Sequence, residues 1–227
     1  MQNEILWFLL LFSNFSMICL MYKLYGKTGL FVYTAISTII TNIQVVVILN
    51  LFSMSVTLGN ITYASNFLIT DILSEYHSKK DAKKAVMIGF SSMIIGTILM
   101  FIVTLMVPNE DGLVAFESIK NIFSIQPRII LASVTTYLIS QSVDISIFKF
   151  LKTLLPSRKY LWVRNNGSTL ISQLIDNILF NFLAFLGVFP ISLIITIVFS
   201  TYVLKVIISL LDTPFVYLIS KIKPRET

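Results

Sequence analysis

Seven long apolar stretches constrain the fold of this chain more than any other feature of its sequence. They cover about residues 5–22, 29–52, 57–75, 84–107, 127–148, 168–188 and 191–220. Most approach or exceed the ~20 residues that a helix needs to cross a bilayer. Only helices and closed barrels satisfy their backbone hydrogen bonds in lipid, and barrel strands alternate at a period of two, which these stretches do not. The sequence therefore predicts an all-α membrane protein, a polytopic bundle of seven transmembrane helices.

The composition supports this class. Hydrophobic residues make up 56% and charged residues 12% of the 227 residues, whereas soluble domains are about a quarter charged. Cys19 is the only cysteine and His77 the only histidine, which excludes a disulfide within the chain and an ordinary zinc-hydrolase site. We expect no metal and no cofactor, and Cys19 is expected to be a small packing residue.

Two of the stretches allow alternatives. The stretch 57–75 is the weakest, because polar residues and a glycine interrupt it, so a broken or re-entrant helix is possible there. The interruptions are Gly59, Asn60, Asn66, Thr70 and Asp71. The stretch 5–22 has no Lys or Arg before it and no small-residue cleavage site after it, so we expect a retained helix and not a signal peptide. The segment 108–126 is expected to contain a short interfacial helix.

The basic residues occur in alternate loops. Fourteen of the seventeen Lys and Arg residues follow the first, third, fifth and seventh stretches: Lys23, Lys27, Lys79, Lys80, Lys83, Lys84, Lys149, Lys152, Arg158, Lys159, Arg164, Lys221, Lys223 and Arg225. By the positive-inside rule, the N-terminus is outside and the C-terminus is in the cytoplasm. The net charge of +6 then reflects topology in a lipid bilayer, and we expect no nucleic-acid partner.

Polar residues recur at helical spacing inside four of the apolar stretches. Residues three and four apart share one face of a helix. One such face carries Asp71 and Glu75, a second carries Gln141 and Asp144, a third carries Thr169, Gln173 and Asp176, and a fourth carries Lys205, Ser209 and Asp212. Ionisable groups in a membrane usually face a polar cavity or a partner. We therefore expect all four faces to point into the bundle.

Two interpretations of these faces remain open. Hydrogen bonds between Ser, Thr, Asn and Gln side chains often hold membrane helices together, and that interpretation is preferred for any single hydroxyl. For Asp176 and Lys205 we favour a role in solute handling, because charged residues within spans are disproportionately functional. A structural ion pair of Lys205 with Asp176 or with Asp144 is the alternative.

The side chains on these faces suit a flat, neutral solute that is rich in hydrogen-bonding groups. A carboxylate can accept hydrogen bonds from the ring N–H and the amino group of a guanine-like edge, while Asn, Gln or Arg can bind the carbonyl and ring nitrogen. The residues alone would equally suit an amino acid or a vitamin.

Four motifs make a more specific hypothesis possible. They are TDILSE at 70–75, followed by KKDAKKAVMIGF, then PRIILAS at 127–133, LWVRNNGSTLISQLID at 161–176 and TPFVY at 213–217. In this order the chain resembles the queuosine precursor transporter family, over about residues 30–220. That family is related in fold to the substrate-binding subunits of energy-coupling-factor vitamin transporters. His77 departs from the pattern, because the family is expected to have Gly after the acidic motif.

The resemblance implies import of 7-deazaguanine compounds such as 7-cyano-7-deazaguanine, 7-aminomethyl-7-deazaguanine or queuine. It also implies that residues 29–227 form a core of six helices and that residues 1–28 are an additional N-terminal helix. A homodimer is an open alternative to a monomer. The residues expected at the substrate site are Asp71, Glu75, Arg128, Gln141, Asp144, Arg164, Asn165, Gln173, Asp176 and Lys205.

Two other classes of function were weighed. A membrane-embedded transferase acting on a lipid or isoprenoid would use Asp71 and Glu75 as ligands of a metal ion. Such enzymes usually need several carboxylates around Mg²⁺, and we find no second acidic motif at the same membrane depth. A purely structural assembly subunit would leave the charged residues within the spans unexplained.

Overall fold

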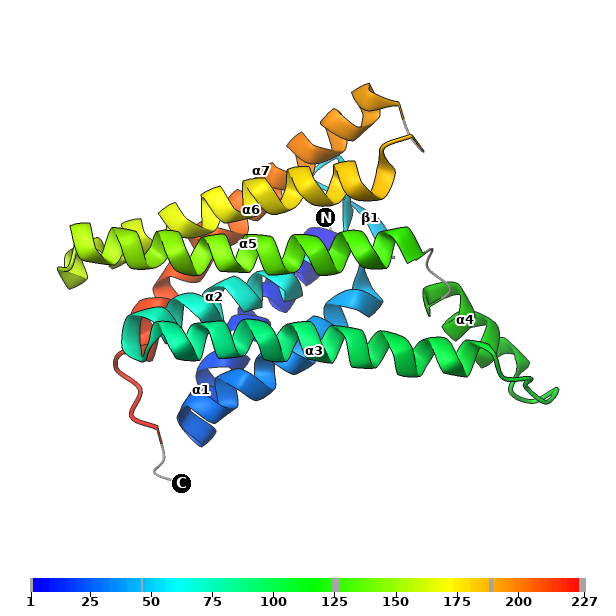
Figure 1. Cartoon of the computed structure of the whole chain (residues 1–227), viewed down its shortest axis with the longest axis horizontal. Coiled ribbons are helices and arrows are strands. Elements are labelled where there is room, and N and C mark those ends of the chain that lie inside the picture. The colour runs from blue at the N-terminus through cyan, green and yellow to red at the C-terminus, as the bar shows by residue number, and fades with distance from the viewer. Residues whose placement is uncertain (1, 46, 124–126, 188–189, 225–227) are drawn as a thin grey trace.

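The chain folds into a bundle of helices with one small hairpin (Figure 1). The structure is a computed structural model and describes residues 2–45, 47–123, 127–187 and 190–224. Its elements are α1 (Gln2–Gln44), β1 (Ile48–Leu51), β2 (Met54–Thr57), α2 (Asn60–Tyr76), α3 (Lys79–Thr104), α4 (Leu113–Phe123), α5 (Pro127–Leu154), the 3₁₀ helix η1 (Arg158–Tyr160), α6 (Leu161–Phe185) and α7 (Ile191–Ile219). Among the described residues, four helical segments are long and apolar enough to cross a membrane, namely α1, α3, the unit Arg158–Phe185 and α7. The prediction of a helical membrane protein is confirmed, whereas the number of spans stays a prediction.

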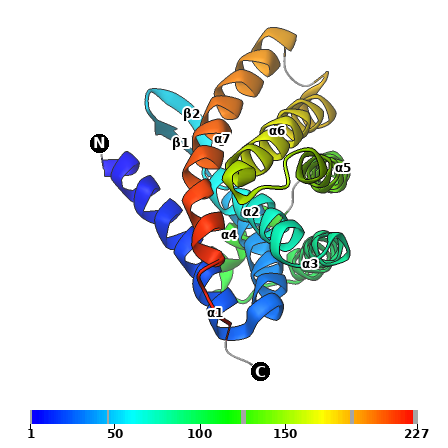
Figure 2. The same cartoon turned by 90° about the vertical axis from the view of Figure 1, so that its left-hand side faces the viewer.

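The first two predicted spans are the two arms of α1, which bend at Gly26 (Figure 2). Gly26 has φ +55°, a left-handed conformation that glycine adopts without steric cost. Gly29 is required for a different reason, because a Cβ atom there would lie 2.1 Å from the backbone oxygen of Met21. The two glycines let the arms fold against each other. Cys19 is buried in the N-terminal arm, so its predicted packing role is confirmed.

The prediction of one helix over 29–52 is wrong at its end. The second arm of α1 stops at Gln44, and β1 pairs with β2 in an antiparallel hairpin. Phe52 and Ser53, between the strands, have φ of 50° and 61°, as in the tight turns that match the twist of a hairpin. A short apolar run reads equally as a strand or as part of a buried helix, so the pattern alone did not separate the two.

The helix α2 lies at the centre of the bundle. Every residue from Ile61 to Leu73 except Tyr63 is buried, and α2 packs against α1, α3, α5, α6 and α7. It is one helix of 17 residues, so the structure gives no support to a broken helix there. Its sequence is less apolar than that of the other spans because its neighbours are protein helices and not lipid.

The ends of several helices extend beyond the predicted spans. The helix α3 begins at Lys79, α5 continues to Leu154, and α6 begins at Leu161. Charged and polar residues lower the hydropathy at these ends but continue the helix. The short helix α4 is confirmed within 108–126, has no buried residue, and lies at the far end of α3 (Figure 1).

Several basic segments meet at one end of the bundle. Lys27, just after the bend of α1, forms an ion pair of 2.9 Å with Asp81 at the start of α3. Arg158 in η1 donates to Ser220 at the end of α7. Pro224 lies beside Gly26, 3.5 Å from the position of a Cβ atom. The basic loops therefore share one face of the molecule, as the charge pattern requires.

Candidate functional site

The polar faces of α2, α5, α6 and α7 point into the bundle. The predicted inward orientation is confirmed by burial, because the following side chains are buried: Asp71, Gln141, Asp144, Arg164, Asn165, Gln173, Asp176, Lys205 and Asp212. These side chains form a continuous polar core that runs along the helices.

The first part of the core is an ion pair between α6 and α7. Lys205 Nζ lies 2.7 Å from Asp176 Oδ2, and the Tyr63 hydroxyl donates to the other carboxylate oxygen at 2.6 Å. Ser140 on α5 also donates to Asp176, at 3.1 Å. Of the two predicted partners of Lys205, Asp176 is therefore the observed one. Tyr63 also places its ring under the ammonium group, 5.4 Å from the ring centroid.

The next carboxyl group, Asp144, contacts hydroxyl groups and the carboxyl group of Asp71. Ser172 on α6 donates to it at 2.9 Å, and Thr70 on α2 lies at 3.3 Å. Thr70 is also 3.4 Å from Oε1 of Gln141. These contacts join α2, α5 and α6 one helical turn away from the ion pair.

Two further carboxyl groups lie nearer the basic end. Asp71 accepts from Thr169 at 3.1 Å and from Ser168 at 3.4 Å. Asp212 on α7 accepts from Nδ2 of Asn165 at 2.8 Å. Neither these two groups nor Asp144 forms an ion pair with a Lys or Arg in the described part of the chain. Carboxyl groups in a dry interior are costly without a cation, so this arrangement calls for an explanation beyond packing.

A second ionic cluster closes the core at the basic end. Arg164, which is fully buried, forms an ion pair of 2.6 Å with Glu75 and donates to the backbone oxygen of Ser157 at 3.0 Å. Lys152 lies 3.3 Å from the second oxygen of Glu75. The cluster fastens the end of α2 to α5, to α6 and to the loop before α6.

The role of Arg128 at the site stays a prediction. This residue lies in the first turn of α5, sixteen residues before Asp144, which places it about 24 Å away along the helix. Its side chain lies outside the described part of the structure. The remaining nine predicted site residues line the polar core or the ionic cluster at its end.

Sequence reasoning missed several members of the core. Tyr63, Asn66 and Thr70 share the inward side of α2 with Asp71. Their helical spacing from the acidic residues was the available signal. Hydroxyl and amide groups are common in membrane helices, so that signal was weak.

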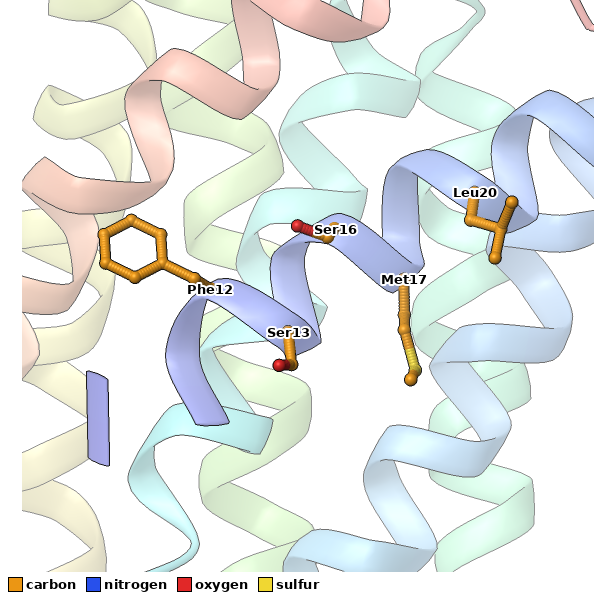
Figure 3. Close-up of a pocket in the computed structure, with 5 residues that line it drawn as sticks. All are labelled: Phe12, Ser13, Ser16, Met17 and Leu20. Atoms are coloured by element: carbon orange, nitrogen blue, oxygen red, sulfur yellow. The ribbon is translucent and has the colours of Figure 1, made fainter. Parts of the chain in front are cut away.

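Among the described residues, no group of three or more His, Cys, Asp or Glu side chains could hold a metal ion. The transferase alternative therefore gains no support from this part of the chain. A shallow depression of about 370 Å³ lies on the outer face of α1, lined by Phe12, Ser13, Ser16, Met17 and Leu20 (Figure 3). It includes no charged side chain and none of the core residues.

Comparisons with known proteins agree with the motifs. Residues 57–219 match the family described as "Putative vitamin uptake transporter". The chain is 36% identical over 226 residues to a protein of Bacillus subtilis (strain 168) named "Probable queuosine precursor transporter", and the match covers 100% of this chain and 98% of the relative. No solved structure matches the chain.

The apolar helices and these matches define a transporter of the membrane. The chain belongs to the queuosine precursor transporter family, as the four motifs indicated. The family model begins at residue 57, whereas the match to the relative includes both arms of α1. The division into an added helix at 1–28 and a core at 29–227 stays a prediction.

Proposed function

We propose that the protein is a multi-pass importer of queuosine precursors in the cell (inner or cytoplasmic) membrane. The solutes would be 7-cyano-7-deazaguanine, 7-aminomethyl-7-deazaguanine or queuine, taken up for the salvage of queuosine in tRNA. The name of the relative and the family match support a transport role. The polar core carries the proposal, because a bundle held by apolar packing alone would not need three buried carboxyl groups without a cation.

In this proposal the solute binds within the polar core, between α2, α5, α6 and α7. The predicted site residues remain the candidates for binding it or for gating its path: Asp71, Glu75, Arg128, Gln141, Asp144, Arg164, Asn165, Gln173, Asp176 and Lys205. The two ionic clusters lie toward opposite ends of the core. They are therefore placed to close the path on either side of a bound solute.

Uptake by cells tests the proposed function directly. Cells that cannot synthesise queuosine precursors would receive labelled precursor with and without this gene, and tRNA queuosine would be measured alongside. We expect label and queuosine to accumulate only with the gene. Equal accumulation in both strains would contradict the proposal.

We further propose that the N-terminus faces outward and that the loop before α6 faces the cytoplasm. Single cysteines at Asn109 and Ser157 test this, because Cys19 is only 6% exposed and contributes little background. An impermeant reagent added to intact cells should label position 109 and not position 157. The opposite pattern would reverse the orientation. The molecular mass of the protein purified in detergent would show whether it forms a homodimer.

A further inference from the structure

The turn of α5 between two carboxyl groups carries a buried carboxamide. Ser140 donates to Asp176 at 3.1 Å, and Asp144 lies four residues further along the same helix. Four residues of helix span about 6 Å. Gln141 lies within this turn and is fully buried, so its side chain is at the level between the two carboxyl groups.

The helix α6 runs past α5 in the opposite direction and repeats the arrangement. Ser172 donates to Asp144 at 2.9 Å, and Asp176 lies one turn further along. Gln173 lies between them and is 2% exposed. A second carboxamide therefore lies at the same level as Gln141.

The helix α2 provides a third carboxamide. The Tyr63 hydroxyl donates to Asp176 at 2.6 Å, and Thr70 lies 3.3 Å from Asp144. Asn66 lies between them along the helix and is fully buried, and its Oδ1 accepts from Ser37 on α1 at 3.0 Å. We call Asn66, Gln141 and Gln173 the amide layer.

Each member of the amide layer has one polar atom with no hydrogen-bond partner in the described part of the chain. These atoms are Nδ2 of Asn66, Nε2 of Gln141 and Oε1 of Gln173. Buried polar groups in native proteins are nearly always paired, so three such atoms at one level are unusual. In contrast, both carboxylate oxygens of Asp144 and of Asp176 have partners. The unused hydrogen-bonding capacity between the two carboxyl groups belongs to the carboxamides.

We propose that the amide layer recognises the lactam edge of a planar heterocycle, that is, a carbonyl group beside a ring N–H. The carbonyl oxygen would accept from Gln141 Nε2 and Asn66 Nδ2, and the ring N–H would donate to Gln173 Oε1. The inference rests on the proposed function and assigns the part of the solute that is read. Tyr63 and Phe67, with ring centroids 5.5 Å apart, border the layer and offer aromatic surface to a flat ring.

This assignment differs from recognition by a carboxylate, and the two can be separated by competition. A carboxylate would require both the ring N–H and the amino group of a deazaguanine. The amide layer requires the carbonyl and the ring N–H only. 7-Deazahypoxanthine keeps the lactam and lacks the amino group, whereas 7-deazaadenine lacks the lactam.

The experiment measures how well each analogue competes with labelled deazaguanine precursor for uptake by cells that carry the wild-type protein. We expect 7-deazahypoxanthine to compete within about threefold of the unlabelled precursor. 7-Deazaadenine should compete at least about tenfold worse, because it leaves buried polar atoms of the layer unpaired. A tenfold loss with 7-deazahypoxanthine, or equal competition by both analogues, would overturn the inference.

A variant of Gln141 tests whether the amide layer is the source of the selectivity between the two analogues. Gln141→Met removes the carboxamide at nearly constant length and should bring the two analogues to within about threefold of each other. Its melting temperature without solute should stay close to that of the wild type, because Nε2 has no described partner and the contact of Oε1 with Thr70 is long, at 3.4 Å. Gln44→Met is the matched control: its carboxamide accepts from Thr62 at 2.5 Å, away from the layer, so this variant should lose stability and keep selectivity.

Two outcomes distinguish this inference from the proposed function. A wild-type protein that takes up no labelled precursor would refute the proposed function and the inference with it. Uptake by Gln141→Met with unchanged selectivity between the analogues would refute the inference alone. Should that variant fail to accumulate, Gln173→Met makes the same test from α6, with the same expected and contrary results.

Discussion

Replacing Lys205 by methionine tests the ion pair in the polar core. The ammonium group lies 2.7 Å from Asp176, and each side chain is 7% exposed. Methionine keeps the length of the side chain and removes its charge. Asp176 would then keep only the hydrogen bonds from Tyr63 and Ser140. A buried carboxylate would lose the one cation that compensates it.

The expected loss of stability follows from this geometry. Removing one partner of a buried ion pair costs about 3–5 kcal/mol. Two hydrogen bonds to the carboxylate remain, so we expect about 3 kcal/mol for Lys205→Met. Asp176→Asn leaves the ammonium group over the ring of Tyr63 and should cost a similar amount. The double variant contains no buried charge here and should lie within about 1 kcal/mol of the wild type.

Thermal and denaturant unfolding of the purified protein in detergent would measure these differences, and the double-mutant cycle would give the coupling between the two residues. A coupling below about 0.5 kcal/mol would refute the reasoning, because it would mean that the pair is not formed in a dry site. Uptake then separates the two interpretations of the pair. We expect the double variant to fold and to transport no solute. Full transport by the double variant would mean that the pair has only a structural role.

Three further predictions concern positions outside the centre of the core. Gly29→Ala should destabilise the protein by about 1–3 kcal/mol in denaturant unfolding, because the new Cβ atom would lie 2.1 Å from a backbone oxygen. Gly96→Ala is the control: a Cβ atom there has its nearest neighbour at 3.7 Å, so this variant should be neutral or stabilising. An equal loss of stability in both variants would contradict the argument. Glu75→Gln removes the carboxylate that pairs with the fully buried Arg164. The free energy of unfolding, measured with denaturant, should fall by about 3 kcal/mol or more. An unchanged unfolding midpoint would show that the cluster is solvated. Partial desolvation lowers the pKa of His77, with a smaller effect from a neighbouring lysine, so folding favours its neutral form and stability is lost as pH falls below about 6.5. Melting temperatures at pH 7.5 and 5.5 should therefore differ more for the wild type than for His77→Asn, and equal differences would refute this assignment.

The sequence was sufficient to predict the helical class and the inward polar faces. Asp71, Gln141 and Asp176 interrupt apolar runs at helical spacing, and a polar group in such a run has few alternatives to the bundle interior. The partner of Lys205 could not be predicted, because Asp144 and Asp176 are both acidic residues on neighbouring helices. In the structure α7 packs against α6, which carries Asp176, and the choice of neighbouring helix depends on packing of the whole bundle.

Local conformation was harder to predict than burial. The end of α1 and the hairpin after it form one apolar run in the sequence, and hydropathy does not distinguish a helix from a short strand. In contrast, the break between the first two spans was predicted between residues 22 and 29, and Gly26 bends α1 there. The end of the second arm depends on how it packs against α2.

The difference between the ends and the middle of the polar core argues against a purely structural role. At the ends, Asp176 pairs with Lys205 and Glu75 pairs with Arg164, and such pairs can fasten helices together. In the middle, the amide layer contains three polar atoms without a described partner, and Arg164 Nε and Asn165 Oδ1 add two more toward the basic end. Each such atom costs about 1–3 kcal/mol when buried. Apolar side chains of the same size would join the helices without that cost. A solute that pairs with these atoms would recover part of the cost on binding, so binding energy and selectivity would arise from the same groups. For this reason the unpaired carboxamides, more than the charged pairs at the ends, are the stronger structural indication that the bundle is built around a polar solute.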